Sequence, residues 1–117
     1  VEGGLVQGLG WMTLEEVAYD EKGRLLSDSL STYKIPDIYS APRIIECVPL
    51  ESPGPEQAIM RSKAVGEPPL MYGIGGFFAL QQAIRAFNPG WEPDFDAPMT
   101  PGKLLLRLYS DNNLPDY

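Results

Sequence analysis

Apolar residues recur at helical spacing near the beginning of the chain. In residues 3–16 five apolar side chains approximate one face of a helix, although four glycines interrupt it. Each glycine inside a helix costs about 0.5–1 kcal/mol relative to alanine. The glycines therefore indicate that this helix packs closely against another backbone or a ligand. They are Gly3, Gly4, Gly8 and Gly10.

A stronger helical pattern follows the prolines at residues 68 and 69, and it is predicted to end before Asn88-Pro89-Gly90. Its apolar positions are Leu70, Ile74, Phe77, Phe78, Ile84 and Phe87. The glycines at 73, 75 and 76 predict close packing on a neighbouring element. A last short helix is predicted over residues 101–109, with Thr100 as its cap.

Between these helices the pattern predicts extended structure. Residues 16–27 suit a hairpin around a turn at residues 20–23. Residues 42–50 are mostly apolar and predict a largely buried strand, with Cys47 as an inert core thiol. The element order favours an α+β fold, in which glycine-rich helices pack on a short antiparallel sheet. We expect one part over residues 1–88, and a linker, short helix and mobile tail over residues 89–117.

Composition narrows the class of protein. Gly and Pro number 12 each in 117 residues, which predicts a loop-rich chain of one small domain. The net charge of −7 disfavours binding to nucleic acid. The longest apolar run, residues 73–80, is too short and too rich in glycine to span a bilayer, so no membrane contact is expected. Because the chain begins with Val1, we expect it to be a piece of a longer protein.

The scarcity of ligating side chains limits the chemistry further. Cys47 is the only cysteine, which fits a reducing compartment and a cytoplasmic protein. The chain has no histidine, so no metal-binding set of side chains is predicted, and acid–base work falls to carboxylate, Lys, Tyr or Cys.

Glu67 is the candidate catalytic residue. It lies between Gly66, which allows an unusual backbone angle or a close approach to a ligand, and Pro68, which keeps it out of the helix that follows. A helix N-terminus favours an ionised carboxylate by about 0.3–1 kcal/mol, and two prolines make its support rigid. A general base needs a side chain that is ionised and fixed. By itself the pattern is also typical of a simple helix-capping residue.

Three stretches resemble the xanthine dehydrogenase family of molybdenum hydroxylases. Lys-Ala-Val-Gly-Glu-Pro-Pro-Leu at residues 63–70 is similar to a signature of that family. The glycine-rich residues 1–10, continued by Thr-Leu-Glu-Glu at 13–16, resemble a helix of its molybdopterin-binding domain, and Ser-Thr-Tyr-Lys-Ile-Pro at 31–36 resembles a third stretch. They follow the family's order and approximate spacing. The resemblance covers about residues 1–88 and implies the C-terminal part of that domain.

The resemblance implies an enzyme that hydroxylates purines, related heterocycles or aldehydes with oxygen from water. In the implied mechanism Glu67 removes the proton of a molybdenum-bound hydroxyl, the resulting nucleophile attacks an electron-poor carbon, and hydride passes to a sulfido ligand. Gly66 would lie against the cofactor through its backbone. The pterin dithiolene holds the metal, so no side chain of this chain need ligate it. Gln7 is a weaker candidate for facing the cofactor, because it also fits a hydrogen bond within the fold.

The resemblance also implies partners. These are the remainder of the molybdopterin domain and the iron–sulfur and flavin (FAD) domains or subunits, since a single cysteine cannot hold an iron–sulfur cluster. The isolated chain is expected to be inactive, with or without bound cofactor, and to self-associate through apolar faces. Two alternatives stay open: an aldehyde oxidoreductase of the same family, and a non-catalytic interaction or assembly module.

Overall fold

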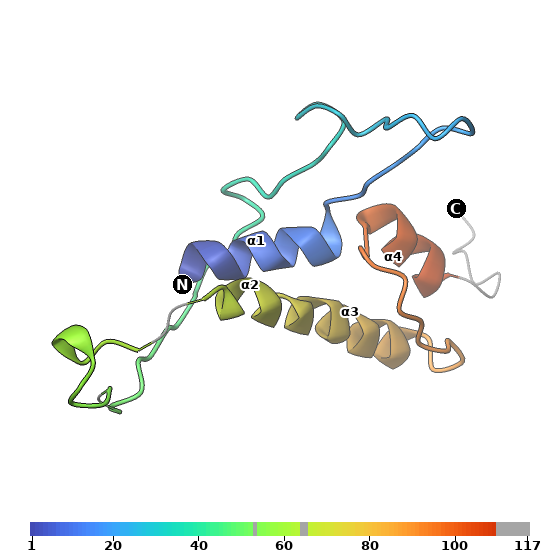
Figure 1. Cartoon of the computed structure of the whole chain (residues 1–117). Coiled ribbons are helices and arrows are strands. Elements are labelled where there is room, and N and C mark those ends of the chain that lie inside the picture. The colour runs from blue at the N-terminus through green and yellow to red at the C-terminus, as the bar shows by residue number, and fades with distance from the viewer. Residues whose placement is uncertain (53, 64–65, 110–117) are drawn as a thin grey trace.

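The computed structural model describes residues 1–52, 54–63 and 66–109, and their regular secondary structure is helical. The elements are α1 (Glu2–Thr13), the short 3₁₀ helix η1 (Ile59–Arg61), α2 (Pro68–Tyr72), α3 (Ile74–Phe87) and α4 (Pro101–Leu108). Helices α2 and α3 follow each other along one line and lie beside α1, while α4 lies near the C-terminal ends of α1 and α3 (Figure 1). The predicted helices are thus confirmed, with one break at Gly73.

Because glycine has no side chain, the backbone of α1 lies in direct contact with α2 and with the junction between α2 and α3. A methyl group added to Gly8 would lie 3.0 Å from the Gly73 Cα atom, and one added to Gly4 would lie 2.9 Å from the Pro69 Cβ atom. Close packing was predicted for these glycines and is confirmed. Gly3 and Gly75 differ, because a methyl group on either would meet nothing within 4 Å.

A small hydrophobic core lies where α1, α3 and α4 converge. Its two most buried side chains are Ile84 of α3 and Met99, which are 0% and 1% exposed. The remaining members are Met12, Phe77 and Trp91, with Leu80, Leu104 and Leu108 packed against them. The Met99 N–H donates to the Met12 carbonyl at 2.7 Å, which ties the segment before α4 to the end of α1.

Ion pairs and a cap hold α4 in place. The Thr100 side chain accepts a hydrogen bond from the Lys103 N–H, as the predicted cap required. Arg107 donates from Nε and Nη2 to both carboxylate oxygens of Asp94, at 2.9–3.1 Å. Lys103 pairs with Asp96 at 3.0 Å and with Glu16 at 3.3 Å. Helix α4 is therefore joined both to the loop before it and to the end of α1.

The predicted antiparallel sheet is wrong, and the α+β fold class with it. In residues 1–52, 54–63 and 66–109 the only β pairing is one isolated bridge between Tyr19 and Leu25. The turn at residues 20–23 forms as predicted, with Gly23 at a φ of 78°. The flanking side chains, including Val17 and Leu26, are exposed. A two-stranded ribbon without an apolar face to bury is marginal in water, so the pairing does not extend.

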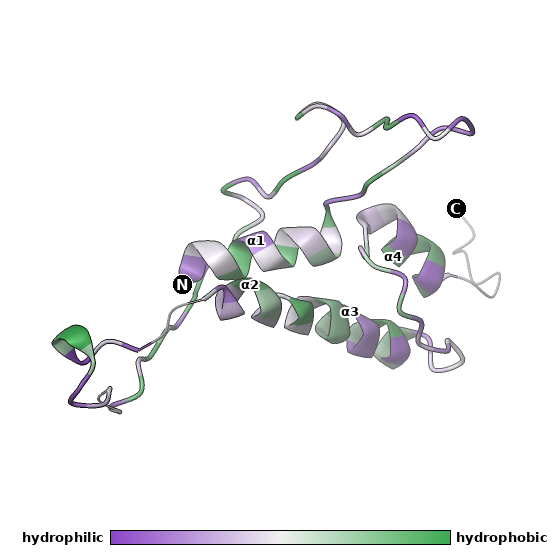
Figure 2. Cartoon of the chain, viewed as in Figure 1, coloured by the Kyte–Doolittle hydropathy of each residue, from purple (hydrophilic) through white to green (hydrophobic). Residues whose placement is uncertain are grey.

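Residues 42–50 form no strand, and the predicted burial is also wrong. Ile44 and Val48 are 79% and 83% exposed, and the Cys47 thiol is exposed rather than in a core. A strand needs a neighbouring backbone for its N–H and C=O groups, and this part of the described chain has none. In Figure 2 the extended chain that leads from α1 toward η1 carries green, apolar stretches. The radius of gyration is accordingly 18.8 Å, against about 13 Å for a compact domain of this length.

Among the residues that the structure describes, no helix combines the length and apolar character needed to cross a membrane.

Candidate functional site

Glu67 lines a hollow between the N-terminal half of α1 and the start of α2. The hollow has a volume of about 150 Å³. Its walls come from both helices: Val1, Gly4, Gln7, Gly66, Glu67, Pro69 and Leu70. The two candidate site residues, Glu67 and Gly66, thus lie together at the head of one helix, and α1 supplies the facing wall.

The backbone of Glu67 forms the N-cap of α2, as the Gly-Glu-Pro-Pro order predicted. Its side chain is exposed and makes no capping hydrogen bond. The Glu67 carbonyl accepts from the Leu70 N–H at 3.0 Å, and the prolines occupy the first turn. No hydrogen bond or ion pair to the Glu67 carboxylate is found in the described ranges. The Glu67 side chain therefore forms no hydrogen-bonded cap, and a favourable charge–dipole interaction with the start of α2 stays an alternative to a catalytic role.

Gly66 needs no special backbone angle. Its φ angle is not positive. Among the glycines of the described ranges, only Gly23 has a positive φ. A methyl group at Gly66 would meet only the Pro68 Cδ atom, at 3.6 Å. The alternative that remains from the sequence is close approach to a ligand, because a glycine leaves its peptide groups uncovered.

Gln7 is the polar residue that α1 adds to this hollow. It is exposed, and it also lines two adjoining hollows, one with Pro36 and one with Trp11. Its amide offers both a donor and an acceptor. The sequence indicated Gln7 only weakly. Its one signal was a polar side chain on an otherwise glycine-rich, apolar helix, and the spacing of residues 7 and 67 gave no indication that they share a wall.

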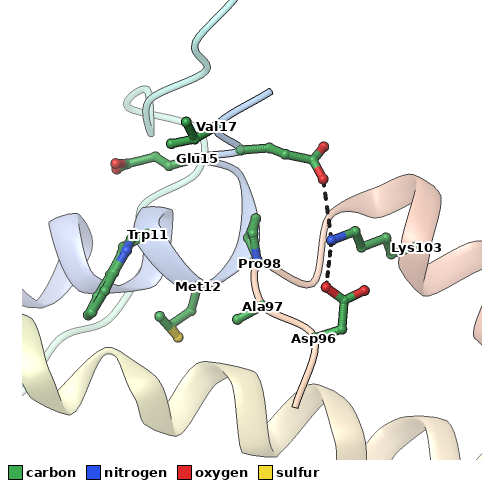
Figure 3. A pocket seen from close by; sticks show the side chains of 9 residues that line it. Trp11, Met12, Glu15, Val17, Asp96, Ala97, Pro98 and Lys103 are labelled. Atoms are coloured by element: carbon green, nitrogen blue, oxygen red, sulfur yellow. Dashed lines mark hydrogen bonds and ion pairs between the residues drawn. The ribbon is translucent and has the colours of Figure 1, made fainter. Parts of the chain in front are cut away.

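A larger hollow of about 470 Å³ lies at the other end of α1, and Figure 3 shows its lining. Each of its charged groups has a partner. Lys103 bridges Glu16 and Asp96, and Glu15 accepts a hydrogen bond from the Tyr33 hydroxyl. That hydrogen bond raises the pKa of Tyr33 above its ordinary value. These groups are occupied in holding the fold together, so we assign the larger hollow no chemistry.

Within the parts of the chain that the structure describes, no three Cys, Asp or Glu side chains gather in a way that could hold a metal ion. The Glu67 hollow therefore offers one carboxylate, one amide and uncovered glycine backbone. Such a set can bind a small polar group and accept a proton from it.

Comparison with known proteins gives one consistent result. Residues 1–42 match the family described as the molybdopterin cofactor-binding domain. The chain is 43% identical to the xanthine dehydrogenase/oxidase of Felis catus over 111 aligned residues, and the alignment covers 89% of the chain. It is 34% identical to xanthine dehydrogenase 2 of Arabidopsis thaliana over 98% of the chain, and 47% identical to the xanthine dehydrogenase of Dictyostelium discoideum over 74%. The chain spans 8%, 9% and 6% of the length of these three relatives.

Proposed function

Because this chain belongs to the xanthine dehydrogenase family and carries part of its molybdopterin cofactor-binding domain, we propose that Glu67 is the general base of a hydroxylation reaction. The observation that supports this role most directly is the Glu67 carboxylate itself. It lies in a hollow, at the end of a proline-supported helix, with no partner in the described ranges. The substrate class is a purine, a related heterocycle or an aldehyde.

The hollow fits one end of the molybdenum cofactor rather than the whole of it. Its volume of about 150 Å³ is below the roughly 300–1,000 Å³ of a site that encloses a whole ligand. None of its lining residues is Lys or Arg, and the Glu67 carboxylate disfavours an anionic phosphate beside it. Gly66 leaves its backbone uncovered for a close approach, because a methyl group there would meet only the Pro68 Cδ atom, at 3.6 Å. The metal-bearing end of the cofactor suits this lining, and the phosphate-bearing end belongs elsewhere in the protein.

The cofactor, when bound, supplies the two-electron redox chemistry of the reaction. The part played by this chain is proton transfer and positioning. An ionised Glu67 takes the proton from the water-derived hydroxyl group that attacks the substrate carbon, through one carboxylate oxygen. Pro68 and Pro69 hold the Glu67 backbone, and the Gln7 amide faces the same space and orients a polar group within it. General-base catalysis of this kind contributes about 10²–10⁴-fold to a rate.

The remaining functions belong to other parts of the protein. Iron–sulfur and flavin domains or subunits carry the electrons away, and the rest of the molybdopterin domain holds most of the cofactor. Because the isolated chain lacks these parts, it is inactive. The complete enzyme works in the cytoplasm, a location that the single cysteine of this chain fits.

The test is the Glu67→Gln substitution in the full-length enzyme that contains this chain. Gln keeps the shape and removes the basicity, so steady-state turnover should fall by about 10²-fold or more, while molybdenum content stays at the wild-type level. Glu92→Gln is the matched control, because Glu92 is an exposed glutamate in the loop after α3, at the opposite end of that helix from α2. Loss of molybdenum in proportion to turnover would make Glu67 a structural residue, and retained turnover would refute the proposal.

A further inference from the structure

We propose that Gly8 and Gly73 are positioning residues, whose backbone contact sets the spacing between the Gln7 and Glu67 walls of the hollow. This inference rests on the role proposed for Glu67. Both glycines are buried. Gly8 of α1 faces Gly73, which lies at the junction of α2 with α3. Gly8 follows Gln7 directly, so the contact lies one residue from the wall that α1 supplies.

The contact leaves no room for a side chain on either glycine. A methyl group on Gly8 would lie within 3.0 Å of the Leu70 carbonyl oxygen and 3.0 Å from the Gly73 Cα atom. A methyl group on Gly73 would collide with the Gly8 backbone and lie 2.6 Å from the Leu9 nitrogen. The obstructing atoms are backbone atoms, which cannot rotate away. Any substitution must therefore move α2 relative to α1.

Such a movement is transmitted to Glu67 through two hydrogen bonds. The Leu70 carbonyl, which a methyl group on Gly8 would strike, accepts the Gly73 N–H at 3.1 Å. The Leu70 N–H in turn donates to the Glu67 carbonyl at 3.0 Å. Pro68 and Pro69 lie between Glu67 and Leu70 and have little freedom to absorb a displacement. The single turn of α2 is thus a stiff link from the glycine contact to the candidate base.

The other glycines of these helices provide a graded series of Gly→Ala variants. Gly75 is the matched control, because an added methyl group meets nothing within 4 Å. Gly4 is intermediate, because its methyl group would lie 2.9 Å from the Pro69 Cβ atom, farther than the nearest backbone atom would lie from a methyl group on Gly8 or Gly73. Gly8 and Gly73 are the severe cases. Displacement of Glu67, and with it the loss of turnover, should increase in that order.

The experiment compares these variants in the full-length enzyme, alone and combined with Glu67→Gln. Gly8→Ala should lower kcat by about 10²-fold, the cost of a misplacement near 1 Å, with KM and molybdenum content unchanged. Gly75→Ala should keep wild-type kcat. In the Glu67→Gln background, Gly8→Ala should lower kcat no further, because the base that it displaces is already absent. Amide exchange supplies a readout without turnover: the Gly73 N–H should exchange faster in Gly8→Ala than in Gly75→Ala.

Each outcome decides the matter. Wild-type kcat in both Gly4→Ala and Gly8→Ala, or unchanged exchange at Gly73, would overturn the proposal. Equal losses of kcat from Gly8→Ala with and without Glu67→Gln would make the contact merely structural. If Gly8→Ala does not fold, the milder Gly4→Ala carries the same double-substitution test. Full turnover in Glu67→Gln alone would instead refute the role of Glu67, and the exchange data would still report on the contact.

Discussion

Arg107 joins α4 to the loop before it. Two of its nitrogens donate hydrogen bonds to the Asp94 carboxylate, and only 12% of the Arg107 side chain is exposed. Lysine keeps the charge but cannot make this two-pronged contact. We predict that Arg107→Lys lowers the free energy of unfolding by about 1 kcal/mol, at the upper end for a partly exposed pair. Urea denaturation of the chain measures it. Arg85→Lys, at an exposed position of α3, should change it by less than about 0.5 kcal/mol.

Asp96 makes the stability of the chain sensitive to acid. A hydrogen bond from Lys103, supported by one from Arg107, holds the pKa of Asp96 below its ordinary value of 3.8. A carboxyl group with a lowered pKa in the folded state stabilises the fold above its unfolded pKa, and that contribution is lost as the pH falls through the lowered value. We predict that Asp96→Asn reduces the loss of Tm between pH 5 and pH 3. Asp28→Asn, outside this network, should leave that loss as it is in the wild type.

At the scale of elements, the helices were predictable because their signals are local. Proline at the start, the Thr100 cap and the apolar spacing from Phe77 to Ile84 act within single turns, and each appears in the structure. The strands were not predictable, because pairing depends on another part of the chain. The turn at Gly23 formed, but residues 42–50 found no neighbouring strand in the described structure.

The candidate site was also predictable only in part, and again the predictable part is the local one. Glu67 at the head of a helix followed from its neighbours in sequence, Gly66 and Pro68. The facing wall did not, because only the packing of α1 on α2 brings Gln7 to the same hollow. The glycine content of α1 predicted close packing, but not that Gly8 would meet the junction after α2.

The packing of α1, α3 and α4 on one another depends on Ile84, the most buried side chain of α3. Its removal leaves a cavity between α1, α3 and α4 that these short elements cannot close. We predict that Ile84→Ala lowers the free energy of unfolding by about 2–5 kcal/mol, enough to unfold a domain of marginal stability. Circular dichroism at 222 nm during urea denaturation measures it. Ile44→Ala, at a position 79% exposed, is the control, and a similar cost there would mean that residues 42–50 are in fact packed.

At the scale of the whole molecule, residues 30–52 and 54–60, which contain no α-helix or strand, present apolar side chains to solvent. The most exposed of the large ones include Leu30, Ile38, Leu50, Ile59 and Met60, each at 76% or more. Exposed apolar surface of this extent drives association. We predict that the 117-residue chain forms oligomers at micromolar concentration and binds a hydrophobic dye. Light scattering measures the mass, and a strict monomer that binds no dye would contradict the prediction.

The role of Glu67 is tested most directly by the first half of the catalytic cycle. In the full-length enzyme, rapid mixing with excess substrate under anaerobic conditions follows reduction of the protein without the later electron-transfer steps. With Glu67→Gln and wild-type molybdenum content, we predict a reduction rate lower by about 10²–10⁴-fold, as expected when a general base is lost. A reduction rate within about tenfold of the wild type, far above what that loss allows, would contradict the account.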